Sequence, residues 1–264
     1  MVRNFLAHLQ FRGTIRERSV EPYVRLLAEL RRRSRVRGVL LDVSSGGGGD
    51  IPSTDFYLAV KRVDQVKPVI ASIGSIGASG AYMAALGARK VYAYPDSIVG
   101  SIGVVFPHLA VAKLLDKLGI DVELLHQGRH KDAFQGVRPL TEEERQKVLA
   151  VAGDSYSSFI DLVARERRRP VEEIRTLATG EFWSGRQALK LGLVDALGDR
   201  EEALQELSRT TGVPVGKTRR VGPPRSLFER LSGSATSLAG DSLRQGVYDA
   251  LEDLVLTSAF GRLR

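Results

Sequence analysis

The sequence predicts a layered α/β fold, because short apolar runs alternate with segments of helical periodicity over the first half of the chain. The runs are rich in β-branched residues and nearly continuous in apolar character, which is typical of strands in a sheet covered on both faces. Strands are predicted at residues 5–11, 39–43, 69–73, 90–94, 102–106 and 120–125. Crossover helices are predicted between them, at residues 22–33, 52–66, 80–86 and 109–118.

The second half of the chain has mainly helical patterns. Thr141 and Glu144 form a capping box, in which each side chain satisfies a free backbone amide of the other, so a long helix is predicted from there to about residue 168. Pro170 begins a further short helix, which ends at Gly180. Two more helices are predicted at residues 185–191 and 201–208, with a strand-like connection at 193–195.

A change in composition near residue 212 divides the chain into two predicted parts. Residues 1–211 form the globular domain, and residues 212–264 form linkers rich in Gly, Pro and Ser, followed by an amphipathic helix. The apolar stripe of this helix favours docking on protein, and peripheral membrane association stays open as the alternative. No apolar run reaches eighteen residues and the N-terminus lacks the pattern of a secretory signal, so the chain as given is expected to be soluble.

Composition excludes several kinds of chemistry. The chain has no cysteine, which rules out disulfides and thiol nucleophiles. Its net charge of +8 could suit nucleic acid, but the basic clusters fall at the ends of predicted helices and no base-reading motif accompanies them, so no nucleic-acid partner is expected. No cluster of His, Asp and Glu suggests a metal, and no glycine-rich phosphate cradle appears, so no cofactor is expected.

Ser79 and Lys131 are the candidate nucleophile and general base. Ser79 lies among small residues that would let a substrate backbone approach, and Lys131 follows an apolar run. A lysine amine can accept the proton of a serine hydroxyl when a dry environment favours its neutral form. Asp132 would favour the charged form instead, so its side chain is expected to point elsewhere.

Glycines beside this pair could supply an oxyanion hole. The run at residues 46–49 follows a predicted strand, and Gly80 stands at the start of a predicted helix, where backbone amides are free. Ser101 could orient the lysine amine. A Ser-His-Asp triad is the rival arrangement, but His130 is adjacent to Lys131 on an extended segment and would point to the opposite side.

These motifs together resemble the signal peptide peptidase A family of bacterial serine-lysine peptidases, which is related in fold to the Clp protease subunit. The matching stretches are residues 44–48, 78–82, 100–104, 131–133, 185–188 and 192–195. The resemblance implies a layered Clp protease/crotonase-like fold of ββα repeats with a helical C-terminal extension. It also implies the site: Ser79 as nucleophile, Lys131 as general base, Ser101 as its support, and the amides of Gly48 and Gly80 as the oxyanion hole.

The resemblance further implies an ATP-independent serine endopeptidase that cleaves extended apolar peptides, such as released signal peptides, within a homo-oligomeric ring. The family is associated with the bacterial cytoplasmic membrane, but this sequence shows no anchor, so its location stays undetermined. The chain departs from the family at Gly46, where a proline is usual, and at Ala81, where a second glycine is usual. Two alternatives stay open: a crotonase-type acyl-CoA enzyme and a catalytically weak peptide-binding scaffold.

Overall fold

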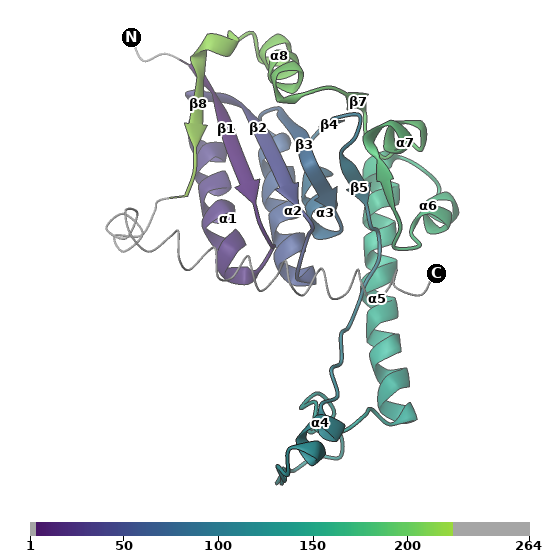
Figure 1. The fold of residues 1–264 in the computed structure, drawn as a ribbon. Coiled ribbons are helices and arrows are strands. Elements are labelled where there is room, and N and C mark those ends of the chain that lie inside the picture. Colours follow the sequence, from purple (N-terminus) through teal and green to yellow (C-terminus); the bar gives the residue numbers. More distant parts are fainter. Residues whose placement is uncertain (1–3, 224–264) are drawn as a thin grey trace. The chain divides into compact units, whose positions relative to one another are not determined.

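One mixed sheet organises the part of the chain that the computed structural model describes, residues 4–223 (Figure 1). In these residues the main strand order is β6-β5-β3-β2-β1-β8, with β4 beside β3 and β7 beside β4. All pairings are parallel except that of β5 with β6. The strands are β1 (Phe5–Arg12), β2 (Val36–Ser45), β3 (Val69–Ala78), β4 (Lys90–Ala93), β5 (Ile98–Gly100), β6 (Phe182–Ser184), β7 (Ala196–Leu197) and β8 (Thr218–Val221).

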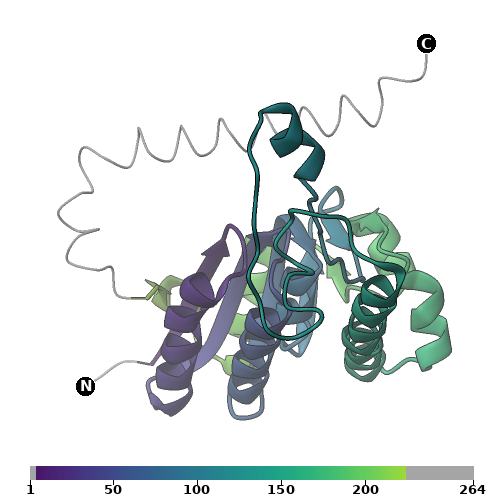
Figure 2. The ribbon, with the colours of Figure 1, turned by 90° about the horizontal axis from the view of Figure 1, so that it is seen from below.

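Helices cover both faces of this sheet, which is why its strands are apolar on both sides. Figure 2 shows α1 (Glu17–Arg32) and α2 (Asp50–Asp64) side by side on one face, and α3 (Gly80–Ala85) packs against α2. Along β1 the side chains alternate between the two faces: Leu9 and Phe11 pack in the core with α1 and α2, whereas Leu6 packs in a smaller core with α8 (Arg200–Thr211). The predicted layered α/β architecture is confirmed.

The long helix α5 (Glu142–Arg167) begins at the predicted capping box, where Thr141 Oγ1 accepts a hydrogen bond from the amide of Glu144. Its second half packs on the core through Phe159, Ile160 and Val163, which are buried. Its first half leaves the apolar side chain of Leu149 exposed. The shorter helices α6 (Val171–Leu177) and α7 (Gly185–Lys190) follow it.

The segment between β5 and α5, residues 101–141, differs from the prediction. It contains one short helix, α4 (Ala112–Lys117), and the strands predicted at 102–106 and 120–125 are absent from it. The chain turns away after β5 through positive φ angles at Gly100 and Ser101, and in Figure 1 the segment extends away from the sheet. With no neighbouring strand to pair with, the segment stays irregular. Ile102 is buried, but many of its other apolar side chains are exposed: Val105 is 83% and Leu125 is 89% exposed.

The sheet continues past the predicted domain end at residue 211. Strand β8 pairs with the first residues of β1, so the compact unit extends to Gly222. The four residues of β8 are too few and too polar to produce a recognisable strand pattern in the sequence. The predicted C-terminal amphipathic helix lies outside the described residues. Within residues 4–223 no helix is long and apolar enough to cross a membrane.

Candidate active site

The candidate residues other than Lys131 gather where β2, β3 and β5 end. In a parallel sheet the loops at the carboxyl ends of neighbouring strands lie together, which is where α/β proteins usually bind ligands. Strand β2 leads into the glycine run at 46–49, β3 leads into Ser79, and β5 leads into Ser101. The fold therefore brings together three sequence segments that lie far apart in the chain.

Ser79 occupies a strained turn between β3 and α3. Its backbone has φ 52° and ψ −126°, a conformation that costs a non-glycine residue about 1–3 kcal/mol. The turn is held because the amide of Ser79 donates to the carbonyl of Gly100 at 2.7 Å and its carbonyl accepts from the amide of Met83 at 3.0 Å. The hydroxyl does not cap α3 and makes no hydrogen bond within residues 4–223. It is therefore free to react.

The glycine run packs directly against this turn. A Cβ atom on Gly47 would lie 2.8 Å from the amide nitrogen of Gly80, and one on Gly48 would lie 2.0 Å from the carbonyl oxygen of Ile15. Both glycines have positive φ angles, so the run tolerates no larger residue at these positions. The amides of Gly48 and Gly80 donate to no other residue of the described part, which leaves two neighbouring donors beside Ser79.

Ser53 stabilises the glycine run, a role that the sequence did not reveal. It is buried in the first turn of α2, and its Oγ donates to the carbonyl of Gly49 at 2.7 Å. The same oxygen would lie only 1.9 Å from a Cβ atom on Gly80. Ser53 thus links the glycine run to Gly80, the residue that follows Ser79. A serine that bonds back four residues at a helix start could have suggested this contact, but only once α2 was placed.

Ser101 lies beside Ser79 because their strands are paired. Ala78 and Gly100 are partners in the β3–β5 register, so the next residue of each strand leaves the sheet at the same level. Ser101 has φ 50°, and its amide donates to the carbonyl of Glu181 at 2.7 Å. The predicted neighbours of the nucleophile are thus brought together: Ser101, Gly48 and Gly80 all flank Ser79.

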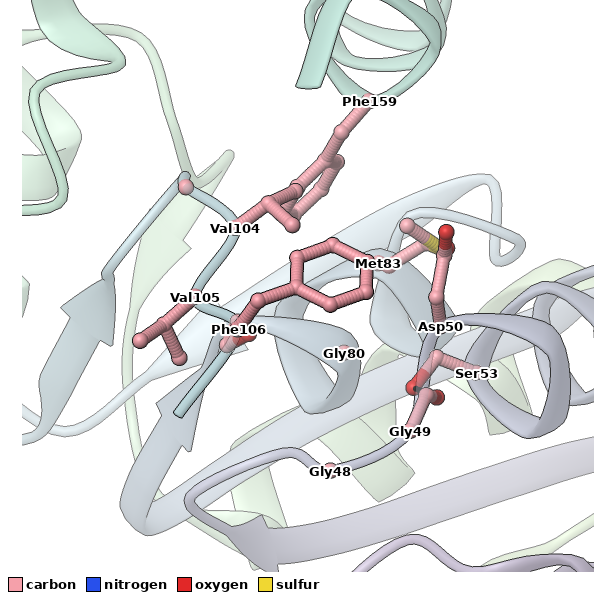
Figure 3. A pocket seen from close by; sticks show the side chains of 12 residues that line it. Gly48, Gly49, Asp50, Ser53, Gly80, Met83, Val104, Val105, Phe106 and Phe159 are labelled. Carbon is pink, nitrogen blue, oxygen red and sulfur yellow. Dashed lines mark hydrogen bonds between the residues drawn. The ribbon is translucent and has the colours of Figure 1, made fainter. Parts of the chain in front are cut away.

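Two cavities meet at Ser79. The first, of about 260 Å³, also contains Gly48 and Gly80 and is lined mainly by the apolar side chains of Met83, Phe106 and Phe159 (Figure 3). The second, of about 550 Å³, lies on the side of Ser101 and includes Leu149 and Tyr156 from α5 and the loop at 178–180. A peptide bound across Ser79 would have an apolar recess available on each side.

Lys131 lies apart from these residues. It stands in a turn of the extended segment 101–141, where its amide donates to the carbonyl of Gly128 at 3.1 Å, and its side chain is exposed. It lines neither cavity, and no contact joins it to Ser79 in the described structure. Within a single chain the candidate base and the candidate nucleophile are therefore not brought together.

Arg138 holds the turn that carries Lys131. Its guanidinium donates to both carboxylate oxygens of Asp132, at 2.7 and 2.9 Å, and also to both oxygens of Glu144 at the start of α5. Hydrogen bonds from Arg138 hold the pKa values of Asp132 and Glu144 below the ordinary carboxyl range. Asp132 therefore points toward Arg138, as expected of a carboxylate that should not hold the Lys131 amine in its charged form.

Neither a histidine nor a metal cluster accompanies Ser79. All four histidines belong to the described part, and none of them lines either cavity. Each has a hydrogen-bond partner elsewhere: Asp42 for His8, the carbonyl of Ala133 for His108, the carbonyl of Gly128 for His126 and Glu144 for His130. In residues 4–223 no group of three or more His, Asp or Glu side chains is arranged to hold a metal ion. Within the described residues no histidine is placed to form a Ser-His-Asp triad with Ser79.

Comparison with known proteins agrees with the fold and with the family that the motifs resemble. The family profile "Peptidase family S49" matches residues 61–214, more than half of the chain. A protein of Synechocystis sp. that is named as a protease is 32% identical over 94% of this chain and 88% of its own length. The chloroplast serine protease SPPA of Arabidopsis thaliana is 30% identical over 88% of this chain, which spans only 35% of that longer protein.

Among solved structures, the ClpP1 subunit of Listeria monocytogenes superposes with a TM-score of 0.50 at 14% identity, covering 74% of this chain and 93% of that subunit. This similarity concerns the fold alone, and it confirms the Clp protease-like architecture. The predicted relationship to the signal peptide peptidase A family is confirmed by the sequence matches. The chain therefore belongs to peptidase family S49 and is a serine peptidase.

Proposed function

We propose that this chain is an endopeptidase in which Ser79 attacks the peptide bond and the amides of Gly48 and Gly80 bind the oxyanion. One observation carries the proposal: the strained turn at Ser79 presents an unbonded hydroxyl between two cavities, beside two backbone amides that have no acceptor in the described part. Amides fixed in this way stabilise the developing charge without reorganising, and such stabilisation accounts for most of the rate enhancement in many enzymes that transfer acyl groups.

In the proposed reaction Lys131 is the general base. Ser79 Oγ bonds to the carbonyl carbon while its proton passes to the neutral amine of Lys131, and the carbonyl oxygen gains the negative charge. The tetrahedral intermediate collapses when the C–N bond breaks, and the leaving amine takes the proton back from Lys131. Water then attacks the acyl-enzyme, again giving its proton to Lys131, and the intermediate releases the acid and restores the Ser79 hydroxyl. Ser101 supports the amine by a hydrogen bond.

Lys131 can serve this role only if the turn that carries it is brought to a Ser79, and we infer that assembly of several copies does this. The segment presents large apolar side chains to solvent, among them Val105, Leu109 and Leu125, which are 79–89% exposed. Burying each such side chain in a subunit contact would contribute about 1.5–3 kcal/mol. A homo-oligomeric ring would cover these side chains and place each Lys131 beside a nucleophile.

The proposed substrates are extended, largely apolar peptides, such as released signal peptides, cut without ATP. The two recesses beside Ser79 are lined mostly by apolar side chains and backbone, which suits unfolded chains held through their main-chain groups. Folded proteins would not fit a site at the base of the loops that follow β2, β3 and β5.

Three variants test the proposal on an unfolded apolar peptide without nucleotide. We expect Ser79→Ala and Lys131→Ala each to lower kcat by at least about a thousandfold, and Ser101→Ala by about tenfold to a hundredfold, since the first two remove reacting groups. Lys113→Ala is the matched control, because Lys113 is an exposed lysine of the same segment. Full activity in Ser79→Ala would refute the proposal.

The same assay separates the alternatives. A wild-type chain that binds peptides but cleaves none would indicate the scaffold function. A chain that cleaves no peptide but binds CoA thioesters, with binding unaffected by Ser79→Ala, would indicate the acyl-CoA function.

A further inference from the structure

The first cavity beside Ser79 contains one charged side chain, Asp50, among the described residues that line it. The other side chains there are apolar or small, including Met83, Phe106 and Phe159. Figure 3 shows the Asp50 side chain extending from the start of α2 toward the part of the cavity where Met83 lies. This carboxylate is the feature of the cavity that could distinguish a charged substrate side chain from an apolar one.

Asp50 has no cation to neutralise it within residues 4–223. Its carboxylate is exposed and forms no ion pair or hydrogen bond with another described residue. The residues three and four positions later on the helix, Ser53 and Thr54, are uncharged. As the first residue of α2, Asp50 lies where the helix dipole favours a negative charge.

The position of this cavity defines which part of a substrate enters it. It contains Ser79 together with Gly48 and Gly80, so a carbonyl group that is attacked by Ser79 and held by the two amides lies at its mouth. The side chain carried by that same substrate residue is the one that would project into the recess. Its stem would contact Phe106 and Met83, and its end would approach Asp50.

We propose that this cavity binds the side chain of the substrate residue whose carbonyl is attacked, and that Asp50 gives the enzyme a preference for lysine or arginine at this position. The inference deepens the proposed function and rests on it. Lysine and arginine have long apolar stems and a terminal cation, so they match both the apolar walls and the isolated carboxylate. Purely apolar side chains still fit, but they leave the carboxylate unpaired.

The size of the preference follows from the exposure of Asp50. An ion pair that remains in contact with water is much weaker than a buried one and is screened by salt. We therefore expect a lysine peptide to be cleaved about fivefold more efficiently than a peptide with the uncharged norleucine at the same position, with a smaller ratio at high salt. A deeply buried carboxylate would give a far larger factor.

The experiment measures kcat/KM for peptides that differ only at this residue: lysine, norleucine or glutamate. In wild type we expect the lysine-to-norleucine ratio of about five to fall toward one between about 0.05 and about 0.5 M salt. In Asp50→Asn the ratio should be about one at all salt concentrations. In Asp50→Lys the glutamate peptide should become better than the lysine peptide.

Asp55→Asn is the matched control, because Asp55 is an exposed carboxylate of the same helix that does not line the cavity. It should keep the wild-type ratio. The inference is overturned if wild type shows no preference for lysine, or if Asp50→Asn retains it. These outcomes differ from failure of the proposed function, in which Ser79→Ala would cleave the norleucine peptide as fast as wild type.

Discussion

Gly80, which directly follows Ser79, has no room for a side chain. An added Cβ atom would lie 1.9 Å from Ser53 Oγ and 2.7 Å from Ser53 Cβ. Ser53 would have to move, and the hydrogen bond that it donates to Gly49 would be lost. We expect Gly80→Ala to lower both kcat/KM and the free energy of unfolding, the latter by about 1–3 kcal/mol, as overpacking usually does.

A double-mutant cycle isolates this contact. Ser53→Gly removes the obstructing atoms and by itself reports the loss of the hydrogen bond to Gly49. In that background Gly80→Ala should cost much less free energy of unfolding than in wild type, measured by urea denaturation. Gly216→Ala is the control, since a Cβ atom there meets nothing within 4 Å. Equal costs of Gly80→Ala in both backgrounds would contradict the explanation.

At this scale the sequence indicated the residues that meet around Ser79 better than the residues that support them. Ser79, Ser101 and the glycines could be found because each stands in a short local motif with its neighbours. Ser53 and Asp50 could not, because the contact of Ser53 and the position of Asp50 depend on how the start of α2 packs beside α3 and the cavity. Nothing within a few positions of either residue in the sequence indicates that contact.

Among the elements, the turn that carries Lys131 depends on one side chain, Arg138. Its contacts with Asp132 and Glu144 connect that turn to the first turn of α5. In Arg138→Ala the two carboxylates would lose their shared partner and the turn would lose its attachment to the helix. We expect kcat to fall about tenfold with KM little changed, because Arg138 acts through the position of Lys131. Arg138→Lys should recover part of the loss, and Arg145→Ala, an exposed arginine of the same helix, should behave as wild type.

The pKa directions give this attachment a defined pH dependence. Arg138 lowers the pKa values of Asp132 and Glu144 in the folded chain. The two ionised carboxylates therefore stabilise the folded chain fully at any pH above the ordinary carboxyl pKa values. This contribution is lost as the pH falls through the lowered pKa values. Hydrogen exchange of residues 128–138, corrected for intrinsic rates, should therefore increase below about pH 4. In Arg138→Ala it should be fast already at neutral pH.

The two strand predictions that failed show where sequence patterns mislead at this scale. Residues 102–106 and 120–125 have the apolar composition of strands. Such a composition indicates that the side chains favour burial, but it does not indicate which strand or chain covers them. In one chain no strand is available beside them, so they form no regular structure. The short strands β5 and β6 were not predicted, because three residues are too few to give a strand pattern in the sequence. They form because β3 provides a sheet edge with which β5 pairs, and β6 then pairs with β5.

For the whole molecule, the exposed apolar residues of segment 101–141 and the exposed Lys131 both favour assembly of several copies. Both lie in segment 101–141, which extends from the sheet and leaves many of its large apolar side chains exposed in the described chain. A second copy that buried these apolar side chains would also lie next to the turn that carries Lys131. Lys131 of one copy could then approach Ser79 of the other copy. The nucleophile and base of one working site would then come from different copies.

Mixing two inactive variants tests this arrangement directly. Ser79→Ala retains Lys131, and Lys131→Ala retains Ser79, so each homogeneous assembly lacks one group at every site. If the base comes from a neighbouring copy, co-assembly in equal amounts should restore complete sites at about one quarter of positions, and activity should rise to about that fraction of wild type. If each chain used its own lysine, no mixed assembly could contain a complete site.

Two differently tagged variants, purified through both tags in sequence, ensure that the assayed assemblies are mixed. The control pairs Ser79→Ala with Lys113→Ala, which keeps every Lys131 and should give about half of the wild-type activity whether the base acts within or between copies. Verified mixed assemblies of the test pair that stay inactive would contradict catalysis between copies. Recovered activity would instead explain why Lys131 lies outside both cavities in the single chain, since its site belongs to the neighbouring copy.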